Sequence, residues 1–103
     1  MTIEKLLDKC EDAYLEDDYK RLIKLCDEVL EKDPDNQTAT GYRSISYCFL
    51  NRPERALELL KEAKRLHPKN YYFKNISAMA YYDLEEYEKS LECCDEGLKI
   101  KDF

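Results

Sequence analysis

PERALELLKEAKRLHP, residues 53–68, is helical by pattern and places its two alanines, Ala56 and Ala63, seven residues apart. Seven residues are nearly two helical turns, so both methyl groups lie on one stripe of the helix. Ala is the best helix former, but that property does not explain why small residues recur at the same phase elsewhere in the chain. We therefore expect a neighbouring helix to approach closely along this stripe, near the lower end of about 8–10 Å between axes.

The chain repeats itself every 34 residues. Pro34 and Pro68 are 34 residues apart, and a further step reaches Asp102. Other positions at this spacing keep size and polarity roughly constant: Tyr47 and Tyr81, Ile23, Leu57 and Leu91, Ala56 and Ser90, and Val29, Ala63 and Gly97. A fixed period of this length indicates stacked structural repeats. We expect one domain over residues 1–103, with repeats at about 3–34, 35–68 and 69–102.

Each period contains two stretches with helical spacing of apolar residues. The predicted helices are 3–15, 19–32, 37–50, 53–66, 71–84 and 87–101. The acidic stretch 16–18 offers a carboxylate cap to the second helix, and Pro53 suits the first position of the fourth. The prediction is an all-α fold of six helices in three antiparallel hairpins.

The repeats resemble the tetratricopeptide repeat, a 34-residue helix-turn-helix unit. The matching residues are Ala13, Tyr19 and Pro34 in the first repeat, Tyr47, Ala56, Ala63 and Pro68 in the second, and Ala78, Tyr81, Tyr87, Ser90, Gly97 and Leu98 in the third. The first repeat departs from the pattern, with Leu22 and Val29 in place of the two alanines. Its hairpin turn is also expected to be one residue shorter than the third, in which Tyr81 and Tyr87 are six residues apart. The resemblance implies a right-handed α-solenoid whose first helices line a concave groove.

Composition excludes several classes of function. The chain carries a formal net charge of −6 and shows no basic stripe, which argues against nucleic acid. It has no apolar run long enough for a membrane span and no signal peptide at its start, so we expect a cytoplasmic protein. Five cysteines without a C-x-x-C pair, and a single histidine, form no zinc set, so we expect no metal and no cofactor.

The resemblance implies that the groove binds an extended peptide or a partner helix, as a protein–protein interaction module or scaffold. The side chains expected to face the groove are Leu7, Glu11, Tyr14, Tyr42, Ile45, Phe49, Tyr72, Asn75, Ile76, Met79 and Tyr82. Aromatic residues suit such recognition because they offer a large contact area at modest entropic cost. Each of these residues could equally be part of the packed core, and the face assignment could be shifted by one residue.

Some members of the family hold the acidic C-terminal tails of heat-shock chaperones with Lys, Arg and Asn side chains. The aligned places in this chain hold Leu7, Glu11, Tyr42, Tyr72 and Ile76. None is a cation, and Glu11 would repel a carboxylate. We therefore predict that the groove does not bind such tails.

Self-association is the alternative function. Leu91, Leu98, Ile100 and Phe103 could lack cover on the last hairpin, which leaves a longer array, a weak homodimer or a tolerated exposed face as possibilities. An enzyme is not expected, because the chain has no phosphate-binding loop, no basic histidine site and no paired carboxylates. On a helix, Cys93 and Cys94 point about 100° apart, so one is expected to be buried and the other exposed.

Overall fold

The computed structural model describes residues 1–101, and this part of the chain consists of six α-helices without a strand. The helices are α1 (Ile3–Leu15), α2 (Tyr19–Lys32), α3 (Gln37–Phe49), α4 (Pro53–Leu66), α5 (Tyr71–Asp83) and α6 (Tyr87–Lys101). The sequence predicts all six, and only α3 and α5 end one residue earlier than expected. Phe103 and Asp102, which the sequence analysis assigns to the end of the third repeat, lie outside the described residues.

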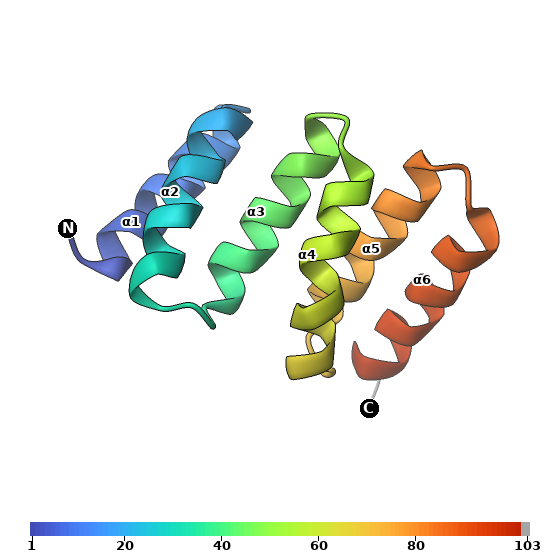
Figure 1. The fold of residues 1–103 in the computed structure, drawn as a ribbon. Helices are drawn as coiled ribbons and strands as arrows, with labels where there is room; N and C mark the ends of the chain where they lie inside the picture. Colours follow the sequence, from blue (N-terminus) through green and yellow to red (C-terminus); the bar gives the residue numbers. More distant parts are fainter. Residues whose placement is uncertain (102–103) are drawn as a thin grey trace.

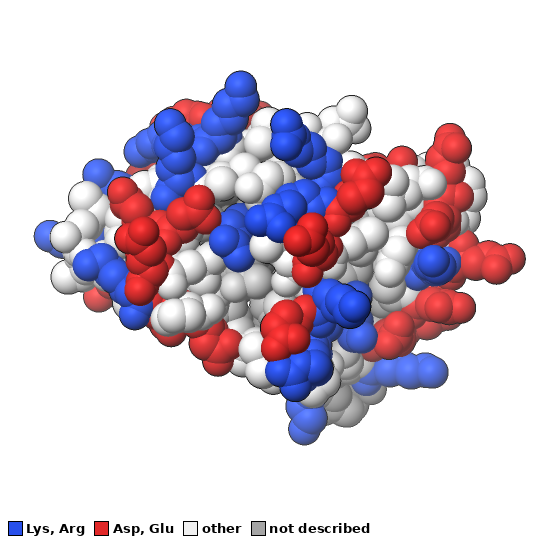
Figure 2. All heavy atoms as spheres, viewed as in Figure 1, with Lys and Arg blue, Asp and Glu red and all other residues white. Residues whose placement is uncertain are grey.

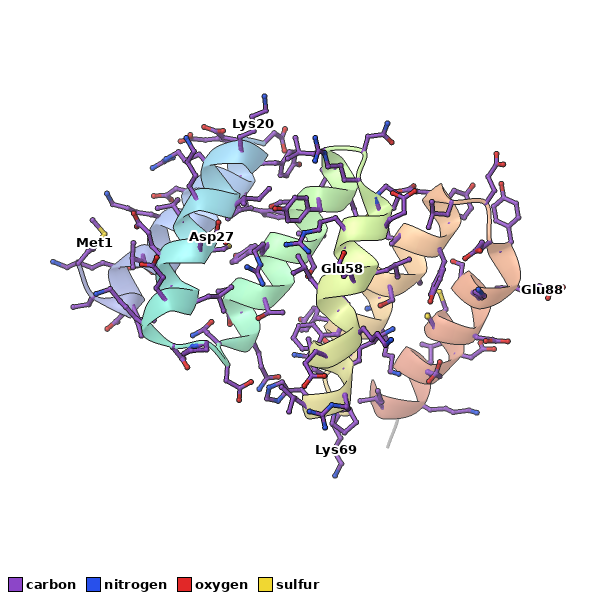
Figure 3. The ribbon with its side chains drawn as sticks, viewed as in Figure 1. Met1, Lys20, Asp27, Glu58, Lys69 and Glu88 are labelled. Carbon is purple, nitrogen blue, oxygen red and sulfur yellow. The ribbon has the colours of Figure 1, made fainter. Side chains whose placement is uncertain are left out.

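The helices form three antiparallel hairpins that stand side by side (Figure 1). The hairpin turns lie at one end of the array, near Lys20, and the turns between repeats lie at the other, near Lys69 (Figure 3). Each helix packs on the next, and the first helices of neighbouring repeats also pack on each other, α1 on α3 and α3 on α5. This arrangement is an all-α solenoid, as the sequence predicts, with α1, α3 and α5 adjacent.

The three hairpin turns have the same length and the same backbone geometry. Asp17, Asn51 and Glu85 follow one another at 34-residue spacing and adopt left-handed φ values of 57°, 64° and 61°. Each turn has a backbone N–H···O=C bond across the helix end: Asp18 to Ala13 (2.9 Å), Arg52 to Tyr47 (2.8 Å) and Glu86 to Tyr81 (2.9 Å). This is the Schellman ending of an α-helix, here built without glycine.

The expectation of a shorter first hairpin turn is therefore wrong. Three residues separate the helices in every hairpin, and the residue equivalent to Tyr47 and Tyr81 is Ala13. The first repeat has lost the aromatic ring at this position but has kept the turn, so aromatic spacing is a poor measure of its length.

The helices that line one side of the array begin with side-chain caps at the same period. Thr2, Asn36 and Asn70 each accept a hydrogen bond from the backbone N–H three residues later, at 3.2, 2.9 and 3.3 Å. These caps satisfy a donor that the helix leaves unpaired. The start of the second helices is less regular: Asp18 caps α2 through the N–H of Arg21, whereas α4 starts with Pro53 and no side-chain cap.

The small residues of the second helices lie in the packed interior, as the opening stretch predicts. Ala56 is fully buried and Ala63 is nearly so, and in the first repeat Leu22 and Val29 fill the equivalent positions. In the third repeat, Ser90 is buried and its hydroxyl donates to the carbonyl of Ala78 at 2.8 Å. The bulkier first repeat and the smaller later repeats therefore use the same packing positions.

Charged side chains cover the surface that faces the viewer in Figure 2, where acidic and basic groups are interleaved. Asp27 on α2 and Glu58 on α4 lie on this face (Figure 3), and they pair with Arg43 at 3.2 Å and Arg55 at 3.0 Å. Such exposed pairs contribute little to stability, so this face behaves as a solvated surface. Among residues 1–101, no helix has the length and apolar character that crossing a bilayer requires.

Candidate peptide-binding groove

A cavity of about 450 Å³ lies between α3 and α5, and α1 reaches its edge. Its position follows from the packing of the first helices against one another, which leaves one face of α3 and α5 uncovered. The lining residues are Tyr14, Gln37, Thr38, Gly41, Tyr42, Ile45, Asn70, Tyr72, Phe73, Asn75, Ile76 and Met79. The size is in the range that takes one or two large side chains of a ligand.

The structure brings together most of the residues that the sequence assigns to a groove. Those that line the cavity are Tyr14, Tyr42, Ile45, Tyr72, Asn75, Ile76 and Met79. Ile76 is also buried in the second core cluster, and Ile45 and Met79 pack against that cluster. These residues serve both as core and as cavity wall, so the two interpretations of the sequence are not exclusive.

The remaining predicted groove residues lie outside the cavity lining. Leu7 is half-buried against the core of the first hairpin, and Glu11 is exposed on α1. The ring of Phe49 stacks on Tyr19 of α2, with centroids 4.7 Å apart, and Tyr82 meets the ring of Tyr87 edge-on at 5.4 Å. Phe49 and Tyr82 are exposed at the hairpin-turn end of the array, where their contact with a partner stays a prediction.

Five lining residues are absent from the sequence-based prediction: Gln37, Thr38, Gly41, Asn70 and Phe73. Two of them could have been found from the repeat itself. Gly41 lies 34 residues after Leu7 and 34 before Asn75, and Thr38 lies 34 before Tyr72. Applying the period to the predicted positions would have supplied both. Phe73 is almost fully buried and meets the cavity only with its edge, which no pattern in the sequence indicates.

The cavity lining carries no charged side chain, although 39% of the chain is charged. Its walls are aromatic and aliphatic, and the rings of Tyr14 and Tyr42 meet with centroids 5.5 Å apart. The polar groups are amides and hydroxyls, and the side-chain amide of Asn70 already donates to Gln37 at 2.8 Å. An uncharged cavity of this kind favours apolar ligand groups over ionic ones.

An acidic surface adjoins the cavity on α1. Glu4, Asp8 and Glu11 follow helical spacing on one exposed face of α1, and none of them takes part in an ion pair within the described residues. Burial raises the pKa of the Tyr42 hydroxyl, and the nearby Glu11 carboxylate raises it further. This effect of Glu11 places the acidic face next to the cavity wall.

The last helix exposes an apolar face, as the sequence analysis anticipates. The side chains of Leu91 and Leu98 on α6 are 64% and 62% exposed, and Ile100 is half-buried. In the first two repeats, Ile23 and Leu57 occupy the position of Leu91 and are half-buried against the next repeat. The exposed face of α6 is thus the face that each earlier repeat covers with its successor.

The thiols do not form a reactive or metal-binding group in the described residues. Cys93 is buried and Cys94 is exposed, as their adjacency on a helix predicts. Burial raises the pKa of the Cys93 thiol, and the neighbouring ammonium of Lys64 opposes that effect. No cluster of three or more His, Cys, Asp or Glu side chains that could hold a metal ion occurs in residues 1–101.

Three helix hairpins in register, with first helices that line a common groove, define a tetratricopeptide-repeat fold. Among solved structures, the chain is similar to the Sgt2 tetratricopeptide-repeat domain of Aspergillus fumigatus, with a TM-score of 0.89 and 22% identity over 96% of this chain and 66% of that one. It is also similar to the first such domain of human RPAP3, with a TM-score of 0.88 and 17% identity over 95% of this chain and 77% of that one.

A third structure is the corresponding domain of Spaghetti (RPAP3) bound to the HSP90 peptide SRMEEVD, with a TM-score of 0.87, 17% identity and coverage of 95% and 78%. Among curated proteins, the chain is 25% identical over 95 residues to the N-terminal acetyltransferase A complex subunit-like protein C418.02 of Schizosaccharomyces pombe. The match covers 92% of this chain and only 14% of the length of that protein. No protein-family model matches the sequence.

Proposed function

We propose that this domain is a protein–protein interaction module that binds a segment of a partner protein, as an extended peptide or a helix, in the groove formed by α1, α3 and α5. The observation that carries the proposal is the uncharged cavity of about 450 Å³ on the side of the array where the first helices meet. The likeness to a domain bound to a peptide supports it. The module has a binding role and no catalytic one.

The groove is tested by removing two of its rings. Tyr42 and Tyr72 both line the cavity, and Tyr72 is exposed, so Tyr42→Ala with Tyr72→Ala removes contact area from the groove. We expect peptides selected on the wild-type domain from an array to bind the double variant at least tenfold more weakly. Tyr87→Ala, an exposed ring on α6 outside the cavity, is the control and should bind as the wild type does. Equal binding by all three proteins would contradict the proposal.

The groove is proposed not to bind acidic chaperone tails. Leu7, Tyr42 and Tyr72 stand where such a site needs cations or amides, and the carboxylate of Glu11 adjoins Tyr42. The heptapeptide SRMEEVD, which the Spaghetti domain binds, is therefore a decisive probe. Titrated calorimetrically, it should show no binding at concentrations of hundreds of micromolar. A dissociation constant near 1 μM, about −8 kcal/mol, would overturn this part of the proposal.

The exposed apolar face of α6 favours self-association as a second candidate function. Leu91 and Leu98 would be covered if two copies met through this face. Sedimentation velocity over a concentration series should then show a rising mass that Leu91→Lys abolishes. A constant monomer mass at millimolar concentration would exclude the dimer and leave the peptide-binding proposal intact.

A cytoplasmic location is part of the proposal. It rests on the free state of the five cysteines, a state that a reducing compartment preserves. Cell fractionation with an antibody to the domain would test it, and recovery with a secreted or organellar fraction would contradict it.

A further inference from the structure

The two glycines of this chain both lie inside helices, where glycine weakens the helix relative to alanine. They differ in what surrounds them. A Cβ atom on Gly97 would lie 3.0 Å from the side-chain oxygen of Asn75 and 3.5 Å from Cβ of Lys74, so α6 needs a small residue there to pack on α5. The internal packing of the protein explains Gly97.

Internal packing does not explain Gly41. A Cβ atom on Gly41 would lie 3.8 Å from Cε1 of Phe73 and 4.0 Å from Cδ1 of Ile76, which are ordinary van der Waals contacts. Gly41 lines the cavity, in the middle of α3. The missing side chain therefore leaves open space in the groove that a larger residue could occupy without a clash. Close approach of a ligand is a reason for glycine at such a position.

The walls around this space determine what can fill it. Phe73 and Ile76 of α5 lie opposite Gly41, and Ile45 lies one turn further along α3. None of the lining side chains carries a charge, so an ionic group placed here would lose its hydration without a partner. A bulky apolar side chain such as Leu, Phe, Ile or Met would bury its surface there at no such cost.

The edge of the groove has the opposite character. Glu4, Asp8 and Glu11 form the exposed acidic face of α1, and Glu11 lies close enough to Tyr42 to raise the pKa of its hydroxyl. These carboxylates have no cationic partner within residues 1–101. Lys or Arg residues of a ligand that leaves the cavity toward α1 would supply the missing positive charge.

We propose that the groove takes a segment of a partner protein that inserts one bulky apolar side chain over Gly41 and carries Lys or Arg residues against the acidic face of α1. This inference rests on the proposed function, because it names the ligand of the same groove. A second copy of this chain and an acidic peptide are the competing occupants, and the same experiment separates them.

A display library of random 12-residue peptides, selected on the immobilised wild-type domain, provides the probe. Enriched sequences are expected to share a bulky apolar residue flanked on one side by Lys or Arg. In synthetic versions, replacing the apolar residue with Ala should weaken binding at least tenfold, and replacing the basic residues with Gln should weaken it severalfold. These measurements need no variant of the protein.

Protein variants test the same contacts from the other side. Gly41→Leu fills the space and should weaken binding at least tenfold, with a melting temperature no lower than that of the wild type. Glu4→Gln, Asp8→Asn and Glu11→Gln together should weaken binding severalfold and reduce its salt dependence. Glu88→Gln, Glu92→Gln and Asp95→Asn on α6 have the same spacing and remove the same charge, so this triple variant should bind as the wild type does.

The outcomes distinguish the two levels of the proposal. Peptides that bind Tyr42→Ala with Tyr72→Ala as strongly as the wild type, or a failure to enrich any peptide, would overturn the groove and this inference together. Peptides that need the two tyrosines but bind Gly41→Leu normally, or that carry acidic instead of basic residues, would overturn this inference alone. Enrichment of sequences from this chain, with a mass that rises with concentration, would identify a second copy as the occupant.

Discussion

Cys26 and Cys94 occupy the same place in their hairpins, two repeats apart, yet Cys26 is fully buried and Cys94 is exposed. Cys26 lies on the face of α2 that α3 covers, whereas no helix of the described chain covers that face of α6. The difference arises from position in the array and not from the local sequence. A solenoid repeat depends on its neighbour for burial, so the terminal repeat shows what the others would expose.

This difference predicts a single fast-reacting thiol. Cys94 is exposed, whereas Cys48 and Cys93 are buried and burial raises the pKa of both thiols. A short pulse of N-ethylmaleimide at neutral pH, read by intact-mass spectrometry, should add one label per chain. The Cys94→Ser variant should take up none in the same time, and full labelling should require denaturant. Equal rates at two or more cysteines would contradict the buried positions.

Alkaline pH should destabilise the fold through Cys48. Burial, with a smaller contribution from Asp83, raises the pKa of this thiol from 9.0 to about 11. Between pH 9 and 11 the unfolded chain therefore loses a proton that the folded chain keeps, so the free energy of unfolding falls as pH rises through this window. Urea unfolding at half-unit steps from pH 8 to 11 measures the decline.

Two replacements separate ionisation from packing at Cys48. Cys48→Ala leaves a small cavity and Cys48→Val keeps the volume, so their stabilities at pH 8 should differ. Because neither side chain ionises, both variants should decline less steeply than the wild type above pH 9. A decline as steep as that of the wild type in both would show that other groups cause it.

Glycine at a hairpin turn should stabilise the protein. Glu85 adopts a φ of 61°, a left-handed conformation that is strained for a side chain such as Glu and free of strain for Gly. We expect Glu85→Gly to raise the free energy of unfolding by about 0.5–1 kcal/mol, after the larger entropy of Gly in the unfolded chain is allowed for. Chemical unfolding followed by circular dichroism measures the change.

The matched control is the same substitution inside a helix. Glu92 lies exposed in α6 and has no left-handed strain to relieve. Glu92→Gly should therefore lower the free energy of unfolding by about 0.5–1 kcal/mol. The prediction for Glu85 would be wrong if both variants lost stability to the same extent.

The 34-residue period predicts much of this fold from the sequence alone. It places all six helices, because Pro34 and Pro68 mark the same point of successive repeats. It does not reveal the left-handed turns, since Asp17 and Glu85 are not the glycines that usually mark such a position. Those turns become recognisable only from the backbone.

The groove is less predictable than the fold for a physical reason. A side chain of a first helix can face the core, the cavity or both, and helical spacing does not separate these cases. Ile76 is both buried and a cavity wall, whereas Phe49, at the end of α3, lies outside the cavity and stacks on Tyr19. Gly41 has no side chain, so a search for large groove-facing residues passes over it.

The two helical glycines should respond differently to alanine. Gly41→Ala adds a methyl group where the nearest atom lies 3.8 Å away, so the gain in helix propensity, up to about 1 kcal/mol, should appear in full. Gly97→Ala forces the side chain of Asn75 to move from 3.0 Å, so its gain should be smaller or absent. Thermal unfolding of both variants under identical conditions gives the comparison. A larger gain for Gly97→Ala than for Gly41→Ala would contradict the tight and open surroundings of these two residues.

Enlarging the small residue at the end of the opening stretch should destabilise the protein. Ala63 is buried on α4 where α5 packs, so Ala63→Leu adds volume to a filled interface and should lower the free energy of unfolding by about 1–3 kcal/mol. Lys61→Leu, an exposed position on the same helix, also introduces Leu and should change it by no more than about 0.5 kcal/mol. Urea unfolding of both variants at pH 7 gives the comparison. If Ala63→Leu proved as stable as Lys61→Leu, the close approach of α4 and α5 at this position would not be required.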